Sequence, residues 1–337
     1  MSEIQYNIQF TKLCQLLQLG ELIGIPEAIS GGLLHRMYRV ETDQGTYAVK
    51  ALNPQIMMRP TAMSNYMNSE RIANLAAAHV PALPAKQYNG TSVQEVENQY
   101  YLVFEWIEGR SLRLNEITPV HSEQIGRVVA GIQKVDFSVL GIPNHPSSLA
   151  PVTNWSHYLQ QGEGSHSLWV NLLGENKDLL HVWNTQANDA AEWLESDKVI
   201  SHGDLDAKNV MWNQDRPIII DWEASGYVNP MSNVIETAIY WSETETGVID
   251  KERFAAFMRG YKMKCGPLHA NWKVVLAYGF LGKLGWLEYN LKRSLGIECT
   301  DEAEQQMGTE QVIATINAIK SYADQIPVLE EWLNEEL

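Results

Sequence analysis

The sequence predicts a two-lobed α+β fold, with a small antiparallel-sheet lobe followed by a larger, mostly helical lobe. Before residue 106, apolar residues alternate with polar ones in short segments, which is typical of strands, whereas after Gly109 they recur mainly at helical spacing. The chain has 337 residues, about twice the length of a typical domain, so two cores can form. We therefore expect one lobe over residues 1–106 and another over residues 107–337.

The first lobe is expected to order its elements as hairpin, helix and hairpin. Alternating patterns flank a turn at residues 43–45, and a second pair of such segments flanks residues 97–99. Strands are expected over 37–40, 46–52, 93–96 and 100–106, and helices over 4–17 and 62–78. This order builds an antiparallel sheet with a helix packed on it.

The second lobe is expected to be helical apart from one segment near its middle. Helical spacing of apolar residues covers 121–135, 178–195, 232–243, 251–264, 270–292 and 305–323. Three short apolar runs predict strands instead, at 199–201, 210–212 and 218–220. Prolines and glycines interrupt residues 141–168, so we expect an irregular connection or a substrate-side insertion there.

The net charge of −16 is concentrated in the second lobe. Residues 1–106 contain 7 Lys and Arg against 9 Asp and Glu, whereas residues 107–337 contain 18 against 32. Nucleic acid is therefore not an expected partner, because phosphate backbones select basic surfaces. The acidic lobe would instead attract a cationic small molecule. An acidic, solvated surface without a ligand is the alternative interpretation.

Neither a membrane partner nor a disulfide is expected. No window approaches the roughly 18 uninterrupted apolar residues of a membrane span, and the amino terminus has no basic stretch before an apolar core. We therefore predict a cytoplasmic protein. Cys14, Cys265 and Cys299 are scattered and show no Cys-x-x-Cys spacing, so no disulfide framework or zinc site is predicted. The sequence leaves both a monomer and a homodimer open.

The strongest chemical signal is the segment SHGDLDAKN at residues 201–209, followed by Asp221 at the end of an apolar run. Phosphoryl transfer requires an oriented nucleophile and cations that hold the phosphate oxygens. A loop that presents Asp204 to a hydroxyl and Asn209 to a metal supplies part of this, and Asp221 supplies a second metal ligand. Magnesium prefers a few oxygen ligands and completes its shell with phosphate and water. Taken singly, each residue would be a turn or cap residue, but their joint spacing favours phosphoryl transfer.

The pattern His-Gly-Asp-x-x-x-x-Asn at residues 202–209, with Asp-Trp-Glu at 221–223, resembles the aminoglycoside phosphotransferase and choline kinase-like family. That family has a protein-kinase-like fold, and the resemblance covers approximately residues 25–290. It implies that Asp204 is the catalytic base and that Asn209 and Asp221 hold Mg²⁺. It also implies that His202 supports the loop. Protein kinases would show His-Arg-Asp, Asp-Phe-Gly and a later Ala-Pro-Glu, so their lack favours a small-molecule acceptor.

The same resemblance implies a phosphate-binding site in the first lobe. Lys50 matches the strand lysine that binds phosphates in the family, and Glu70 on the following helix is its expected carboxylate partner. A surface salt bridge is the alternative interpretation of that pair. Backbone N–H groups of Ser30, Gly31 and Gly32 can close over phosphates, although two glycines are also common in an ordinary hairpin turn.

The purine of the nucleotide is expected at the segment that joins the lobes. By position in the family, the Glu105 carbonyl and the Ile107 amide would hydrogen-bond the base. Recognition through backbone groups leaves no side-chain signature. ATP is therefore the default donor, and GTP is not excluded.

The acceptor is expected to bind through carboxylates and aromatic residues that follow the central motifs. The candidates are Asp206, Glu223, Glu236, Trp241, Glu243 and Trp286. For each of them, a helix-core or solvated-surface role is the alternative interpretation. We predict an ATP- and magnesium-dependent O-phosphotransferase acting on a small cationic molecule, first of all an aminoglycoside or another basic antibiotic. A metabolic kinase for choline, ethanolamine, homoserine or methylthioribose and a non-catalytic nucleotide-binding pseudokinase are the alternatives.

Overall fold

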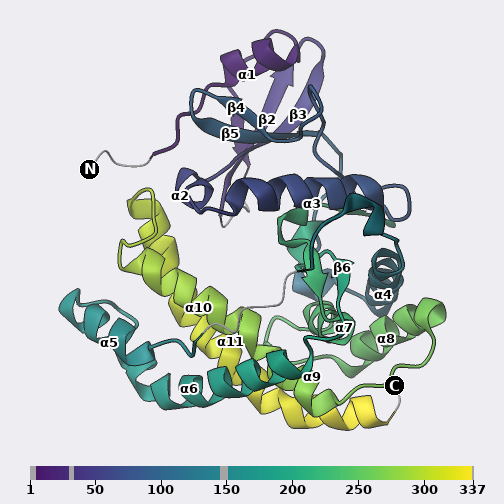
Figure 1. The fold of residues 1–337 in the computed structure, drawn as a ribbon, viewed down its shortest axis with the longest axis vertical. Coiled ribbons are helices and arrows are strands. Elements are labelled where there is room, and N and C mark those ends of the chain that lie inside the picture. The colour runs from purple at the N-terminus through teal and green to yellow at the C-terminus, as the bar shows by residue number, and fades with distance from the viewer. Residues whose placement is uncertain (1–4, 30–33, 145–150, 336–337) are drawn as a thin grey trace. The chain divides into compact units, whose positions relative to one another are not determined.

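The computed structural model describes residues 5–29, 34–144 and 151–335 (Figure 1). The chain divides into two compact units. The sheet unit comprises Met1–Leu112, Val135–Ile142 and His202–Gly226, and the helical unit comprises Arg113–Lys134, Pro143–Ser201 and Tyr227–Leu337. The predicted α+β class, with an antiparallel sheet and a mostly helical second part, is confirmed. The segment that carries the His-Gly-Asp motif groups with the sheet.

The sheet unit is built on a five-stranded antiparallel sheet in the order β1-β2-β3-β5-β4. Its strands are β1 (Glu27–Ile29), β2 (Arg36–Thr42), β3 (Gly45–Ala51), β4 (Gln94–Val96) and β5 (Gln99–Glu105). Both predicted hairpins are confirmed. Strand β1 is three residues long and pairs with β2, and its length is too short to produce a detectable alternation.

Helices cover both faces of this sheet, as Figure 1 shows for α1 and α3. One core cluster joins α1 (Phe10–Leu17) to Val49 and Val103, and the other joins α3 (Ala62–Ala76) to Leu102 and Phe104. The short helix α2 (Pro54–Met57) contributes Ile56 to the second cluster. Side chains alternate along a strand, so Lys50, which follows Val49, lies on the α3 face.

Helix α1 begins at Phe10, later than the prediction of a helix over 4–17. Tertiary hydrogen bonds explain the difference, because the backbone before the helix pairs with β5 side chains. The Asn7 N–H donates to Gln99 Oε1 at 3.2 Å, and the Gln9 N–H donates to Tyr101 Oη at 2.8 Å. These N–H groups therefore bond to β5 side chains instead of joining a longer helix.

A second part of the sheet unit presents the His-Gly-Asp and Asp-Trp-Glu motifs on short elements. Strands β7 (Val210–Asn213) and β8 (Arg216–Ile219) form an antiparallel pair, flanked by the 3₁₀ turns η3 (Ala207–Asn209) and η4 (Trp222–Ala224). The predicted strands in this region are therefore confirmed. An isolated bridge joins Ala82 to Ile219, and η4 packs against α3. These contacts hold the segment against the sheet.

The helical unit contains eight α-helices within its described residues. They are α4 (Pro119–Gln133), α5 (Trp155–Gly164), α6 (Val170–Trp193), α7 (Pro230–Tyr240), α8 (Lys251–Cys265), α9 (Trp272–Tyr278), α10 (Phe280–Ser294) and α11 (Glu302–Asn334). Strand β6 (Val199–Ser201) pairs with β9 (Gly226–Val228) beside them. The 3₁₀ turn η1 (Leu114–Glu116) precedes α4 in this unit, whereas η2 (Ser138–Leu140) belongs to the sheet unit.

Two expectations for the helical unit are corrected. Residues 141–168 are not wholly irregular, because α5 forms there with Asn154 Oδ1 accepting the His157 N–H at 3.1 Å. The predicted helix over 270–292 is two helices that break at Gly279, where a Cβ atom would lie 2.2 Å from Tyr322 Oη. Within the described residues, no helix combines the length and apolar character that crossing a membrane requires.

Candidate active site

His202 anchors the loop that follows β6. Its side chain is buried, with Nε2 3.0 Å from the Ile220 carbonyl oxygen and Nδ1 3.3 Å from the Asp204 amide nitrogen. An amide can only donate, so Nδ1 accepts and Nε2–H donates, which makes the imidazole the neutral Nε2–H tautomer. Burial lowers the pKa of His202, in agreement with a neutral ring. The ring thus connects two backbone segments of the site.

Gly203 is required by the close approach of the loop to η4. Its φ is +81°, and a Cβ atom there would lie 2.3 Å from the Ala224 carbonyl oxygen. A side chain at this position would push the loop away from η4, because the neighbouring atom belongs to backbone. The glycine of His-Gly-Asp therefore sets how closely the loop approaches the Asp-Trp-Glu turn.

Asp204 and Asn209 are joined directly. The Asn209 Nδ2 group donates to the Asp204 carbonyl oxygen at 2.8 Å and to Asp204 Oδ2 at 3.0 Å. This orientation leaves Asn209 Oδ1 as the side-chain atom with lone pairs for a cation. Lys208 Nζ lies 3.7 Å from Asp204 Oδ2 and 3.3 Å from Asp206 Oδ2. Burial raises the pKa of Asp204, and Lys208 opposes that shift.

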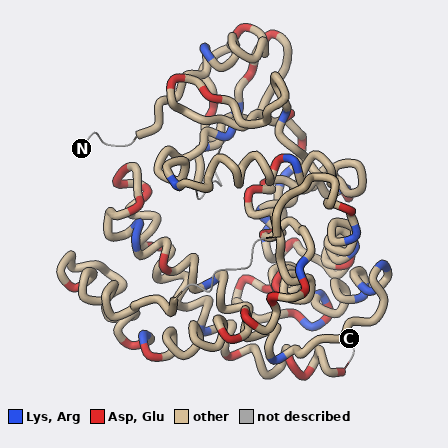
Figure 2. The backbone as a smooth tube through the Cα atoms, viewed as in Figure 1, with Lys and Arg blue, Asp and Glu red and all other residues tan. Residues whose placement is uncertain are grey.

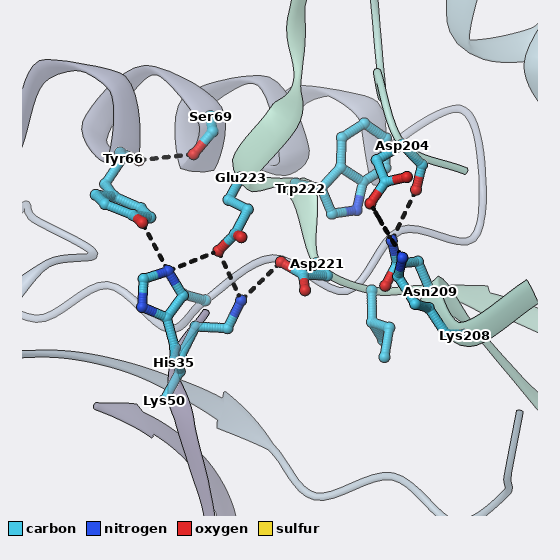
Figure 3. A network of polar contacts seen from close by, with 12 residues as sticks. His35, Lys50, Tyr66, Ser69, Asp204, Lys208, Asn209, Asp221, Trp222 and Glu223 are labelled. Atoms are coloured by element: carbon cyan, nitrogen blue, oxygen red, sulfur yellow. Dashed lines mark hydrogen bonds and ion pairs between the residues drawn. The ribbon is translucent and has the colours of Figure 1, made fainter. Parts of the chain in front are cut away.

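Asp221 lies beside this pair because the backbone holds it there. The Ile220 N–H donates to the Asn209 carbonyl oxygen at 3.0 Å, so residues 209 and 221 approach one another. Asp221 has φ +60°, a left-handed conformation that costs a non-glycine residue about 1 kcal/mol or more. Figure 3 shows Asp221 between the Lys50–Glu223 contact and the Asp204–Asn209 contact.

Lys50 is paired with carboxylates of the Asp-Trp-Glu turn rather than with Glu70, so that expected pairing is wrong for this structure. Lys50 Nζ lies 2.6 Å from Asp221 Oδ1 and 3.1 Å from Glu223 Oε2. Burial would lower the pKa of Lys50, but Asp221 and Glu223 outweigh it and raise that pKa. Glu70 instead accepts the Ala85 N–H at 2.6 Å.

Glu223, which we expected among the acceptor-binding residues, pairs with Lys50 and His35. Its carboxylate contacts Lys50 and, at 3.1 Å, His35 Nε2. Burial alone would raise the pKa of Glu223, yet Lys50 and His35 hold it well below its usual range. His35 Nε2 also lies 2.7 Å from Tyr66 Oη, and His35 Nδ1 accepts the Asn53 N–H at 2.9 Å. Sequence reasoning missed the roles of His35 and Tyr66, because neither stands in a recognisable motif.

The other residues expected to contact nucleotide are placed as follows. Glu105 ends β5, and its exposed side chain pairs with Lys86 at 2.9 Å, while Ile107 follows it in the segment leading to Gly109. Ser30, Gly31 and Gly32 lie outside the described residues. Asp206 caps η3 by accepting the Lys208 N–H at 3.1 Å, so its carboxylate stabilises the loop itself.

Four acceptor candidates belong to the helical unit. Trp241 is fully buried, which corrects the expectation that it contacts a ligand. Trp286 donates to Gln311 Oε1 at 3.4 Å and packs on Tyr289, so it joins α10 to α11. Glu243 lies after α7, where its backbone bridges to Ile249. Glu236 lines a small cavity together with Lys283 and Tyr322, so that cavity carries both signs of charge.

Burial of Glu70 predicts a specific pH dependence of stability. The pKa of Glu70 is raised to about 7, first by burial, against an unfolded value of 4.5. Between these values the folded chain binds more protons than the unfolded chain, so the free energy of unfolding falls as pH rises through this window. The Glu70→Gln substitution removes the ionisation but keeps an oxygen for the Ala85 N–H. We expect the variant to gain about 3 kcal/mol relative to the parent between pH 4.5 and pH 8.5.

Urea unfolding at several pH values measures this difference. The matched control is Glu95→Gln, because Glu95 is an exposed carboxylate on β4 of the same unit. Parallel stability curves for the parent and the Glu70→Gln variant would contradict a buried carboxyl group at this position.

The fold is kinase-like, and a family match defines the class of protein. Residues 26–263, more than two thirds of the chain, match the phosphotransferase enzyme family, APH. The chain therefore belongs to this family and is a small-molecule phosphotransferase. No curated protein matches the chain significantly.

Solved structures share this fold at low sequence identity. A spectinomycin phosphotransferase in complex with ADP and spectinomycin is 12% identical with a TM-score of 0.67, over 94% of this chain and 99% of that one. An ethanolamine kinase from Plasmodium vivax is 15% identical with a TM-score of 0.57, over 87% and 82%. A choline kinase from Cryptosporidium parvum is 12% identical with a TM-score of 0.58, over 96% and 98%. At such identities, the similarity establishes the fold.

Proposed function

We propose that the protein is an ATP- and magnesium-dependent O-phosphotransferase that moves the γ-phosphate onto a hydroxyl of a small molecule. The observation that carries this proposal is that the Lys50–Asp221 contact and the Asn209–Asp204 contact lie next to each other, because the Ile220 N–H donates to the Asn209 carbonyl oxygen (Figure 3). The spectinomycin phosphotransferase neighbour was solved with ADP, which supports an adenine nucleotide. GTP is the alternative donor, since Glu105 and Ile107 would bind the purine through backbone groups alone.

In the proposed reaction, the acceptor hydroxyl oxygen attacks the γ-phosphorus while the bond to the β–γ bridging oxygen breaks. The products are a phosphomonoester and the nucleoside diphosphate. Asp204 accepts the proton of the hydroxyl, for which its burial-raised pKa makes it a better base than an exposed aspartate. Lys50 holds phosphate oxygens through its ammonium group, and His202 keeps the loop in position.

The donor set fits a magnesium ion. Asn209 Oδ1 and the Asp221 carboxylate are hard oxygen donors, and the described residues contain no cluster of three or more His, Cys, Asp or Glu that would hold a metal alone. Two protein ligands with phosphates and water completing the shell is the usual arrangement for Mg²⁺. The site also carries four carboxylates against two ammonium groups, so a triphosphate would be repelled without added positive charge. The ion would supply that charge.

We assign the nucleotide to residues 1–106 and the catalytic and acceptor-binding functions to residues 107–337, in the cytoplasm. The excess of 32 acidic over 18 basic residues in the second range supports a cationic acceptor. Figure 2 shows these acidic positions spread over many helices and loops, so the attraction is a general field rather than one patch. An aminoglycoside or another basic antibiotic is our first choice, with antibiotic resistance as the biological role.

A metabolic kinase is the second candidate. It is favoured by the choline kinase and ethanolamine kinase neighbours, which are as similar in fold as several antibiotic phosphotransferases. The choice matters for the acceptor alone, since both candidates use the same phosphoryl-transfer residues. A non-catalytic pseudokinase is disfavoured by the joint presence of Lys50, Asp204 and Asp221.

A panel of acceptors assayed by ADP release tests the proposal. The panel comprises aminoglycosides, spectinomycin, choline, ethanolamine, homoserine and methylthioribose, and an Asp204→Asn variant measures acceptor-independent ATP hydrolysis. We expect one class of acceptor to raise ADP release in the parent alone, with a phosphomonoester detected by mass spectrometry. Turnover confined to a metabolite would refute the antibiotic assignment. Nucleotide binding without transfer to any broad set of hydroxyl compounds would establish the pseudokinase instead.

A further inference from the structure

His35 is held as a neutral hydrogen-bond donor whose single Nε2 proton faces both Glu223 and Tyr66. Its Nδ1 accepts the Asn53 N–H at 2.9 Å, so the ring proton must be on Nε2. Nε2 lies 3.1 Å from Glu223 Oε2 and 2.7 Å from Tyr66 Oη. The His35 side chain is only 2% exposed, so water cannot take the place of either partner. Figure 3 shows His35 between Tyr66 and Glu223.

The residues around His35 fix its orientation from two directions. Asn53 is buried and also caps α2, since its Oδ1 accepts the Gln55 N–H at 2.9 Å. Tyr66 belongs to α3, whose buried face packs on the sheet. The imidazole is therefore constrained by backbone on one side and by a phenol on the other. Such a constrained donor loses little freedom when it binds a carboxylate.

Glu223 transmits this constraint to Lys50. The same oxygen, Glu223 Oε2, lies 3.1 Å from His35 Nε2 and 3.1 Å from Lys50 Nζ. Lys50 Nζ also contacts Asp221 Oδ1 at 2.6 Å, so two carboxylates hold the ammonium group from the same turn. Without the hydrogen bond from His35, the Glu223 carboxylate could rotate, and Lys50 would lose one of its two fixed contacts.

We propose that His35, braced by Tyr66, is a positioning residue that holds Glu223 on Lys50 and thereby places the Lys50 ammonium group for the phosphates of the nucleotide. This inference rests on the proposed function, because it takes Lys50 as the phosphate-binding lysine. It differs from the expected arrangement, in which Glu70 of α3 would hold Lys50. Here α3 acts through Tyr66 and His35 instead.

The test measures the dissociation constant of Mg²⁺–ADP by calorimetry, which requires no knowledge of the acceptor. The variants are His35→Leu, His35→Gln, Tyr66→Phe and Glu223→Gln. Loss of an outer hydrogen-bond partner of a binding group commonly costs about 10- to 100-fold in affinity. We expect His35→Leu to weaken Mg²⁺–ADP by about tenfold or more, and His35→Gln, which keeps a neutral donor, to recover most of that loss. Tyr66→Phe leaves the Nε2 proton to Glu223 alone, so it should change the affinity less than His35→Leu does.

A double-mutant cycle isolates the path through Glu223. In the Glu223→Gln background, His35→Leu should change the dissociation constant by less than about threefold, since the transmitting carboxylate is gone. An equal effect of His35→Leu in both backgrounds, or equal losses in His35→Leu and His35→Gln, would show a merely structural role and overturn the inference.

Two further measurements keep the inference falsifiable if His35→Leu does not fold. Long-range ¹H–¹⁵N spectra of the parent should show His35 as the Nε2–H tautomer, with its ring shifts moved by Glu223→Gln and not by Glu95→Gln. An Nδ1–H tautomer would refute the geometry. Lys50→Met separates this inference from the proposed function. If it leaves Mg²⁺–ADP affinity intact, the phosphate-binding role of Lys50 fails. A loss with Lys50→Met and none with Glu223→Gln refutes only the path from His35 through Glu223.

Discussion

Replacing Asp204 by alanine should lower kcat by about 10²- to 10⁴-fold while leaving nucleotide affinity nearly intact. The Asp204 carboxylate is partly exposed, and Asn209 orients it through a hydrogen bond to Oδ2, with a second hydrogen bond to the Asp204 carbonyl oxygen. Removing the carboxylate deletes the proton acceptor without touching the Lys50–Asp221 contact. The measurement is steady-state ADP release with the acceptor found in the panel, together with Mg²⁺–ADP calorimetry.

The matched variant Asp204→Asn keeps the shape of the side chain and one oxygen for the Asn209 amide, so it separates basicity from packing. We expect it to be nearly as inactive as the alanine variant. Near-native turnover in either variant on the true acceptor would mean that another group is the base.

Replacing Asp221 by asparagine should remove productive binding of the magnesium nucleotide. Asp221 is the proposed metal ligand and also the nearest carboxylate to Lys50, with 2.6 Å between Oδ1 and Nζ. Loss of an outer hydrogen-bond partner of a metal ligand typically costs about 10- to 100-fold in metal affinity, and loss of the ligand itself should cost at least as much. We expect the affinity for Mg²⁺–ADP to fall by at least this factor.

The magnesium dependence of ADP binding distinguishes loss of a metal ligand from a general loss of structure at the site. Without magnesium, Asp221→Asn removes a negative charge from the site, so free ADP should bind the variant as well as the parent or better. The control is Asp215→Asn, because Asp215 is exposed in the turn between β7 and β8 of the same unit. A variant that keeps its magnesium-dependent gain in ADP affinity would exclude Asp221 as a metal ligand.

Local signals predicted most of the elements and the central loop. The hairpins of the sheet follow period-2 patterns with turn residues between them, and α3 follows a helical pattern that ends before Pro81. The spacing of Asp204, Asn209 and Asp221 was informative because a short antiparallel strand pair must bring its two ends together. The backbone contact between Ile220 and Asn209 is the result.

The partners of individual side chains could not be predicted in the same way. Glu70 was expected on Lys50 because both lie near one face of the sheet, but its carboxylate turns to the Ala85 N–H. Glu223 reaches Lys50 because Asp221 adopts a left-handed conformation at the start of η4, which no propensity would indicate for aspartate at this position. The buried position of Trp241 depends on helix packing, and spacing alone fits a core or a surface role equally.

The structure of the complex with Mn²⁺, in place of Mg²⁺, and a non-hydrolysable ATP analogue tests the central claim most directly. We predict an anomalous-scattering peak for the ion within about 2.0–2.3 Å of Asn209 Oδ1 and an Asp221 carboxylate oxygen, with phosphate oxygens completing its shell. Lys50 Nζ should contact the phosphates, and Asp204 should face the γ-phosphate. An ion or triphosphate bound away from Asn209 and Asp221 would contradict the proposed site.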